Sequence, residues 1–184
     1  MKAKPTNHRR AVLLELGRRD EPLMAAAAMA TSRFKLKKIL VPVDFSECAK
    51  KALRYAIPLA KEHGAAITLL YVVPPNQALG EYGGIAYTSM EAEMRASGEK
   101  QLAQLVRDEV GCEVPAATIV RKGSPALEIV DAATSLAADL IVISTHGRTG
   151  LKHVFLGSVA EHVMRRAPCP VLVVREEERD FLAA

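Results

Sequence analysis

Hydrophobic residues between Lys37 and Val174 follow two alternating patterns. Short unbroken apolar runs, of the kind that a parallel strand buried on both faces requires, alternate with longer segments whose apolar residues recur at helical spacing. The runs predict strands at Lys37–Asp44, Ala65–Val73, Asp139–Ser144 and Val171–Val174. A weaker strand is predicted at Glu113–Arg121, where Pro115 interrupts the apolar residues and marks the start of the strand or an edge position. Helices are predicted between them, over residues 46–64, 90–110, 124–136 and 158–166.

Residues at the helix ends support these boundaries. Ser46 stands where a side-chain oxygen can cap the first helix, and Gly64 follows that helix as a C-terminal glycine. Ser124-Pro125 places proline at the first position of the third helix. The glycine- and tyrosine-containing segment 76–89 predicts a long loop.

Strands that alternate with helices predict an α/β fold, a doubly wound five-stranded parallel sheet with right-handed crossovers. In such sheets ligands bind outside the carboxyl ends of the strands, where the strand order reverses. Asp44 ends the first predicted strand, Val72 lies at the end of the second and Ser144 ends the fourth. If the first and fourth strands are neighbours, these three residues face one crevice.

The connection formed by residues 145–156 is far longer than the roughly 2–6 residues that usually join a strand to a helix. It contains Gly147 and Gly150, and the next helix begins at Gly157-Ser158. Glycines let backbone N–H groups approach an anion closely, and a helix N-terminus supplies aligned donors. The pattern predicts a phosphate-binding loop.

Composition and charge narrow the possible partners. The 184 residues are 49% hydrophobic and 25% charged, as in one α/β domain, but only 4% are aromatic and none is Trp. The chain therefore has few aromatic side chains on which the bases of a single-stranded nucleic acid could stack, which argues against recognition of this kind. The net charge of +4 is accounted for by residues 1–34, where seven Lys and Arg oppose three Asp and Glu. The remaining domain is about neutral, so we expect no nucleic-acid partner.

Cysteine usage and hydropathy favour the cytoplasm. Cys48, Cys112 and Cys169 are odd in number and widely spaced, which predicts neither a disulfide framework nor a metal site. No stretch approaches the roughly 20 apolar residues of a membrane span. We expect a cytoplasmic protein with no membrane partner.

Both chain ends are predicted to lie outside the domain, which we place at residues 34–176. Residues 1–33 are expected to form a disordered or partly helical extension, with a short amphipathic helix over Ala11–Arg19. The alternative is that the start codon is assigned too early and that Met24 or Met29 is the true start. Residues 177–184 are expected to form a C-terminal tail.

Three linked motifs extend across the predicted domain. They are Val-Pro-Val-Asp-Phe-Ser at residues 41–46, Leu-Leu-Tyr-Val at 69–72, and Thr-His-Gly-Arg-Thr-Gly followed by Leu-Gly-Ser-Val and Pro-Cys-Pro-Val-Leu-Val-Val within 145–174. In this order they resemble the universal stress protein family, of the UspA type. The resemblance implies a Rossmann-like (adenine nucleotide alpha hydrolase-like) sheet of strand order 3-2-1-4-5. That sheet agrees with the five predicted strands.

Nucleotide-binding members of that family carry Gly, two residues, Gly, nine residues, and Gly with Ser or Thr. Here Gly147 is the second glycine and Gly157-Ser158 the third with its hydroxyl, whereas Ser144 occupies the first position. The resemblance implies ATP, AMP or ADP as ligand, with or without Mg²⁺, with Asp44 on the ribose, Val72 beside adenine and the glycine loop on the phosphates. The predicted nucleotide-binding residues are Pro42, Val43, Asp44, Val72, Ile143, Ser144, His146, Gly147, Arg148, Gly157, Ser158 and Val159.

Several of these residues also have a purely structural interpretation. Asp44 can cap the helix that follows it, His146 can be satisfied by backbone or water, and Arg148 can be solvated. Ser158 and His162 have ordinary helical i, i+4 spacing and no third group to orient them, so we predict no catalytic triad.

The last strand, Pro170–Val174, is expected at a sheet edge although it is apolar throughout. Exposed apolar edges invite pairing with another chain. This argument and the family resemblance both predict a homodimer through this strand. The alternative is that a helix or the N-terminal arm covers the edge.

These features together predict a universal stress protein that binds ATP or AMP and acts in stress response or signalling. The motifs include no Walker A lysine motif, no positioned base and no carboxylates for Mg²⁺ beyond the lone Asp44, so we expect no efficient enzyme and at most slow ATP hydrolysis. The alternative is a nucleotide-free interaction or regulatory module of the same fold, favoured if Ser144 closes the site. An adenylating enzyme would need a glycine-rich loop after the first strand, and residues 45–50 contain no glycine.

Overall fold

The structure is a computed structural model that describes residues 2–5, 12–15, 35–75, 84–147 and 156–175. It contains two units, Met1–Lys35 and Leu36–Ala184. In the first unit, strands β1 (Lys2–Pro5) and β2 (Val12–Glu15) pair antiparallel. The helix predicted over Ala11–Arg19 is therefore wrong at residues 12–15. Successive apolar residues there suit a strand as well as a helix, and short apolar runs do not distinguish the two.

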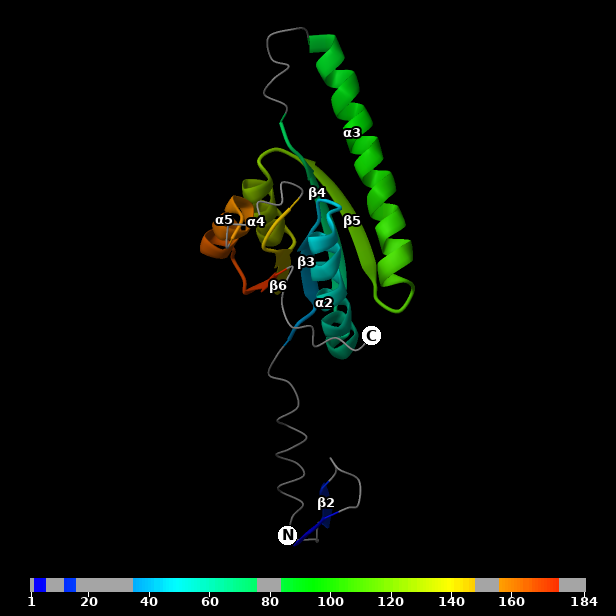
Figure 1. The fold of residues 1–184 in the computed structure, drawn as a ribbon, viewed down its shortest axis with the longest axis vertical. Helices are drawn as coiled ribbons and strands as arrows, with labels where there is room; N and C mark the ends of the chain where they lie inside the picture. Colours follow the sequence, from blue (N-terminus) through cyan, green and yellow to red (C-terminus); the bar gives the residue numbers. More distant parts are fainter. Residues whose placement is uncertain (1, 6–11, 16–34, 76–83, 148–155, 176–184) are drawn as a thin grey trace. The chain divides into compact units, whose positions relative to one another are not determined.

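The second unit contains the predicted five-stranded parallel sheet (Figure 1). Its strands have the order β5-β4-β3-β6-β7, which is 3-2-1-4-5 when they are counted along this unit. The first strand, β3, is central, so the strand order reverses between β3 and β6. The predicted fold class is confirmed. The bounds are β3 (Lys38–Pro42), β4 (Ala66–Val73), β5 (Ala116–Lys122), β6 (Leu140–Ser144) and β7 (Val171–Val174).

The connections are helical and close to prediction, except at the start of the second helix. Ser46 caps the first helix by accepting a hydrogen bond from the N–H of Ala49 (3.2 Å), and Gly64 ends it with a left-handed φ of 59°. The second helix begins at Gly84, so the loop prediction is wrong over residues 84–89. Residues 85–89 contain neither Gly nor Pro, so nothing in them stops the helix that is predicted from Met90 from extending toward Gly84. The helices are α2 (Glu47–His63), α3 (Gly84–Leu105), the π-helical turn η3 (Val106–Val110), α4 (Pro125–Ser135) and α5 (Ser158–Arg166).

Alternate residues along each strand supply two cores, one on each face of the sheet. On one face Ile39 and Val41 pack with α2 and with the carboxyl half of α3. On the other face Leu40 and Ile141 pack with α4 and α5. The central strands are buried on both sides, which explains why they are unbroken apolar runs in the sequence.

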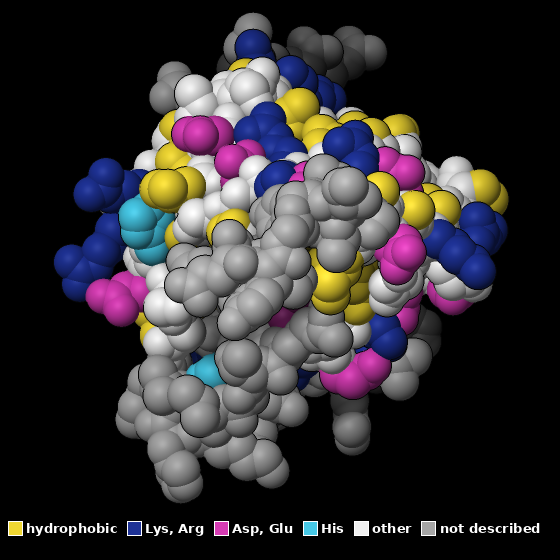
Figure 2. All heavy atoms as spheres, turned by 90° about the horizontal axis from the view of Figure 1, so that it is seen from above, with side chains coloured by type: hydrophobic (Ala, Val, Ile, Leu, Met, Phe, Trp, Pro, Cys, Tyr) yellow, Lys and Arg dark blue, Asp and Glu magenta, His cyan; other side chains and the backbone are white. Residues whose placement is uncertain are grey.

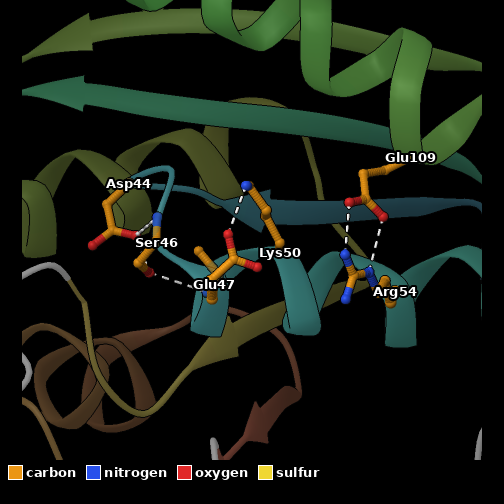
Figure 3. A network of polar contacts seen from close by, with 7 residues as sticks. Asp44, Ser46, Glu47, Lys50, Arg54 and Glu109 are labelled. Carbon is orange, nitrogen blue, oxygen red and sulfur yellow. Dashed lines mark hydrogen bonds and ion pairs between the residues drawn. The ribbon is translucent and has the colours of Figure 1, made fainter.

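A bidentate ion pair attaches η3 to α2 (Figure 3). The Nε and Nη2 atoms of Arg54 each donate to a carboxylate oxygen of Glu109 at 2.9 Å. This hydrogen bonding holds the pKa of Glu109 below its ordinary value. Beyond the turn, the Lys61 ammonium contacts Glu113 and lowers the pKa of that carboxylate as well. The C-terminal end of the α3–η3 unit is thus fixed to the surface of α2.

Candidate functional site

The carboxyl ends of β3 and β6 separate and open a crevice between them. The ladder between these strands consists of the pairs Ile39–Leu140 and Leu40–Ile141. By contrast, β3 stays paired with β4 as far as Pro42, and β6 with β7 as far as its last residue. The sheet therefore opens where the strand order reverses, which is the ligand site of open α/β sheets.

A cavity of about 390 Å³ occupies this crevice, within the size range of small-molecule sites. Its walls come from the ends of β3, β4 and β6, from the first turns of α4 and α5, and from α3. Seen from above, where Figure 2 looks along the strands onto this end of the molecule, the coloured Lys and Arg side chains are interspersed with Asp, Glu and hydrophobic groups. The described side chains on this face thus form no single-sign patch.

Asp44 follows β3 and is fixed by the turn that begins α2 (Figure 3). Its Oδ1 accepts hydrogen bonds from the N–H of Ser46 (3.1 Å) and from the Ser46 hydroxyl (2.6 Å). The other oxygen, Oδ2, is directed away from Ser46 and lies against Gly147. Both bonds to Ser46 use Oδ1, so one carboxylate can support the turn and also line the cavity.

The segment between β6 and α5 is closed at its base by hydrogen bonds. The Ser144 hydroxyl donates to the carbonyl of His146 (2.9 Å), and the His146 ring pairs through Nδ1 with the Thr145 hydroxyl (2.9 Å). The N–H of Gly157 donates to the carbonyl of Thr145 (2.8 Å), and the N–H of Thr145 donates to the carbonyl of Val174 on β7 (2.9 Å). Thr145, only 4% exposed, therefore joins the two ends of the loop to the sheet.

At two glycines of the site, another atom occupies the space that a Cβ atom would take. A Cβ atom at Gly147 would overlap Oδ2 of Asp44. A Cβ atom at Gly157 would lie 2.8 Å from the carbonyl oxygen of Thr145, although φ at this residue is an ordinary −69°. Gly147 thus allows the close approach of the Asp44 carboxylate, and Gly157 allows closure of the loop base.

The first turn of α5 borders the cavity with backbone. Its N-cap residue is Gly157, and among the residues that the structure describes no side chain caps this end of the helix. The first N–H groups of a helix have no intrahelical partner and carry the positive end of the helix dipole, so they attract anions. One turn further, Nε2 of His162 is buried and has no hydrogen-bond partner within the described part of the chain, so this nitrogen is not bonded to Ser158.

Every predicted site residue that the structure describes lines this one cavity, and the role of each in binding stays a prediction. These residues are Pro42, Val43, Asp44, Val72, Ile143, Ser144, His146, Gly147, Gly157, Ser158 and Val159. Arg148 lies outside the described residues.

Sequence reasoning missed part of the cavity wall. Thr145 and Ala160 adjoin predicted residues, and Pro125 begins a helix whose start was predicted, so chain position alone could have found these three. Met94 carries no such signal, because its placement depends on how α3 packs on the sheet. The missed residues are Tyr71, Pro74, Met94, Pro125, Ile129, Thr145 and Ala160.

The fold and the crevice define a doubly wound α/β protein with a small-molecule cavity at its switch point. The model of the universal stress protein family matches residues 35–175. The universal stress protein MJ0531 of Methanocaldococcus jannaschii is 36% identical over 144 residues, which cover 78% of this chain and 85% of that protein. The chain belongs to the universal stress protein family.

Solved structures agree with this assignment. The structure of MJ0577, a universal stress protein of the same organism, superimposes with a TM-score of 0.71 at 28% identity and covers 79% of this chain and 99% of that chain. A universal stress protein of Archaeoglobus fulgidus, solved in complex with dAMP, has a TM-score of 0.52 at 23% identity and covers 77% of this chain and 99% of that chain. The second likeness concerns the fold alone.

Proposed function

We propose that the cavity binds an adenine nucleotide, ATP or AMP. The observation that carries the proposal is the convergence of three kinds of surface on one cavity: apolar strand ends, the Asp44 carboxylate and the uncapped N-terminus of α5. They suit a base, ribose hydroxyls and phosphates respectively. The dAMP complex of the Archaeoglobus fulgidus protein supports the proposal, because an adenine nucleotide is bound there by a protein of the same fold.

In this arrangement the nucleotide spans the crevice from β4 to α5. Val72 and Ile143, 8% and 4% exposed, contribute the apolar wall for adenine. Asp44 accepts hydrogen bonds from the ribose, and the backbone N–H groups from Ser158 onward receive the phosphates. Mg²⁺ would be held chiefly by the phosphates, since the described residues contain no group of three or more metal-ligating side chains.

Ser144 separates this proposal from the nucleotide-free alternative. A side chain at the first glycine position was expected to favour that alternative if it closed the site. The Ser144 hydroxyl instead bonds to the carbonyl of His146 (2.9 Å), and the cavity beside it retains about 390 Å³. This geometry favours the nucleotide-binding function.

Co-purified nucleotide provides a direct test. The chain has four Tyr and no Trp, so it absorbs weakly at 280 nm and bound adenine would dominate its near-ultraviolet spectrum. We expect denaturation to release a nucleotide that chromatography identifies, and calorimetry to detect ATP binding to the stripped protein. Absence of both release and binding at millimolar ATP would overturn the proposal.

A pair of carboxylate variants then locates the site. Asp44→Ala is expected to weaken ATP binding by about tenfold or more, because it removes a charged acceptor. Asp131→Ala, an exposed carboxylate on α4 away from the cavity lining, is the matched control and should bind as the unmodified protein does. Equal affinities of the two variants would place the ligand elsewhere.

We propose further that the protein is a homodimer paired through β7. The carbonyls of Pro170 and Val174 accept from Ile141 and Thr145, so these residues face β6. By the alternation of a parallel ladder, the N–H and C=O groups of Val171 and Val173 point to the outer edge. That edge is the surface on which a second copy would pair.

Proline tests the pairing, because it is tolerated at an edge but removes the outward donor. Sedimentation is expected to show a dimer for the unmodified protein and for Val173→Ala, which keeps its N–H, and a monomer for Val173→Pro. A monomeric unmodified protein at micromolar concentration, or a dimeric Val173→Pro, would contradict pairing through β7.

The physiological role that fits this site is nucleotide-dependent regulation in stress response rather than rapid turnover. Apolar residues make up most of the cavity lining, and within the described residues no hydrogen bond links the Ser158–His162 pair through Nε2. We therefore propose at most slow ATP hydrolysis. The widely spaced cysteines suit a reducing compartment, so we also propose a cytoplasmic location. Among the described residues, no helix has the length and apolar character to cross a membrane.

A further inference from the structure

The turn that carries Asp44 contains a strained aromatic residue. Phe45 has a φ of 66°, in the left-handed region that bulky residues rarely adopt. Its ring contacts Tyr71 on β4, with centroids 4.8 Å apart and planes inclined by 44°. This separation is within the range of favourable aromatic pairs. The unfavourable backbone conformation is therefore accompanied by a specific ring contact to the neighbouring strand.

Tyr71 is in turn confined by α3. A Cβ atom at Gly98 would lie 2.5 Å from Cδ1 and 2.7 Å from Cε1 of the Tyr71 ring, so the helix backbone lies directly against it. Tyr71 is 8% exposed and also lines the cavity. Its ring cannot move toward α3, and Phe45 rests on a fixed surface.

The left-handed turn determines where the Asp44 carboxylate points. It brings both the N–H and the hydroxyl of Ser46 back onto Oδ1, at 3.1 and 2.6 Å. With Oδ1 held there, Oδ2 lies on the Gly147 side of the crevice. An extended Phe45 would carry Ser46 away from Asp44 and release the carboxylate.

We propose that Phe45 and Tyr71 are positioning residues, whose ring contact maintains the left-handed turn that aims Asp44 into the cavity. They thereby set how strongly the protein prefers a nucleotide with ribose hydroxyls over one without them. The inference rests on the nucleotide-binding function proposed above. Neither ring needs to touch the ribose for this effect.

Both rings also belong to the core on their face of the sheet, and the test must separate positioning from packing. Loss of packing alone lowers stability and leaves the preference for ribose hydroxyls unchanged. Loss of positioning weakens ATP binding selectively, because 2′,3′-dideoxyATP has no hydroxyls for Asp44 to accept from. The ratio of the two dissociation constants is therefore the informative readout.

The experiment measures this ratio by calorimetry for the full chain and four variants. The unmodified protein is expected to bind ATP about tenfold or more tighter than 2′,3′-dideoxyATP. Phe45→Tyr keeps the ring and should keep the ratio. Phe45→Gly removes the ring but still adopts the left-handed turn easily, so the ratio should fall only in part. Phe45→Ala has no ring and does not favour the left-handed turn, so the ratio should fall to about twofold. Leu105→Ala, a buried residue of the same core outside the cavity lining, is the control that lowers stability and keeps the ratio.

Each result is decisive. A stepwise fall in the ratio from Phe45→Tyr through Phe45→Gly to Phe45→Ala, with dideoxyATP affinity unchanged, supports the inference. The inference is overturned if Phe45→Ala or Phe45→Gly keeps the ratio of the unmodified protein. It is also overturned if the unmodified protein binds both ligands equally well. In each of these cases the proposed nucleotide binding still holds. If the unmodified protein binds neither ligand, the proposed function itself fails.

Discussion

At their amino ends, β3 and β6 are joined by one carboxylate. Oδ2 of Asp139 accepts from the N–H groups of Lys37 (2.8 Å) and Lys38 (2.9 Å), and the N–H of Asp139 donates to the carbonyl of Lys38 (2.9 Å). At their carboxyl ends the same strands are separated by a cavity, and the turns at Asp44 and Thr145 replace the ladder.

The contrast indicates that the two ends of the sheet have different roles, one in stability and the other in ligand binding. Bonds at the closed end connect the strands to each other, so their loss should reduce stability. Bonds at the open end hold backbone and carboxylate in position around a space, so their loss should chiefly reduce ligand binding. Substitutions at the two ends should therefore be distinguishable by which measurement they change.

Gly157→Val should have the largest effect. Its side chain would collide with the carbonyl of Thr145 and force the loop base open, so ATP affinity should fall by about hundredfold or more, or roughly 2.7 kcal/mol, with some loss of stability. Calorimetric titration measures the affinity. Gly64→Ala, at a left-handed position with open space around it, is the control and should lose stability only. Wild-type affinity in Gly157→Val would show that closure of the loop is unrelated to binding.

Asp139→Ala should destabilise the closed end by about 1–2 kcal/mol, because two backbone N–H groups lose a charged acceptor. Urea unfolding measures this change, and ATP affinity should stay the same. The same substitution at exposed Asp131 should change stability by no more than about 0.5 kcal/mol. A substantial loss of ATP affinity in Asp139→Ala would contradict the separation of the two ends.

Gly147→Ala should weaken ATP binding by about tenfold, because the new methyl group displaces Oδ2 of Asp44. The reason can be isolated with a double-mutant cycle. In an Asp44→Ala background the same substitution should cost about twofold or less. Additive effects would show that Gly147 acts on the ligand directly instead of through the carboxylate.

Glu109→Gln should have the smallest effect, about 0.5 kcal/mol of stability at neutral pH, because the partner Arg54 side chain is 52% exposed and solvent screens the pair. The pKa of Glu109 is lower in the folded protein than its ordinary value of 4.5. The ion pair therefore stabilises the fold fully when the pH is above that ordinary value, and this stabilisation is lost as the pH falls through the folded pKa. Urea unfolding measured from pH 7 downward should show a difference that is largest at neutral pH and shrinks as the pH falls below about 4.5. A difference that does not shrink as the medium becomes acidic would exclude the ion pair as its source.

Much of the fold was predictable because local and global signals agree. Apolar runs marked every strand of the sheet, and caps such as Ser46 and Gly64 marked the ends of α2. The start of α3 at Gly84 was missed, since segment 84–89 has no strong helical pattern and the glycines of segment 76–89 suggest a loop. The strand at Val12–Glu15 was missed because an apolar run this short is compatible with the spacing of a helix as well as with that of a strand.

The candidate site was predictable where its residues follow strands, and not where it depends on packing between distant elements. Asp44 and Ser144 end strands, so topology brings them together. The approach of Asp44 to Gly147 and of Gly98 to Tyr71 depends on how separate segments meet in space. The left-handed backbone at Phe45 carries no sequence signal, because that conformation is normally left to glycine.

The bond from the N–H of Gly157 to the carbonyl of Thr145 has a consequence for how this family can vary. It fixes the exit from β6 and the entry to α5 at one point, so the number of residues between these two anchors need not change where the two elements meet. Doubling the length of a flexible connection adds only about 0.6 kcal/mol of closure entropy. Insertions between Thr145 and Gly157 should therefore change the stability of the sheet little.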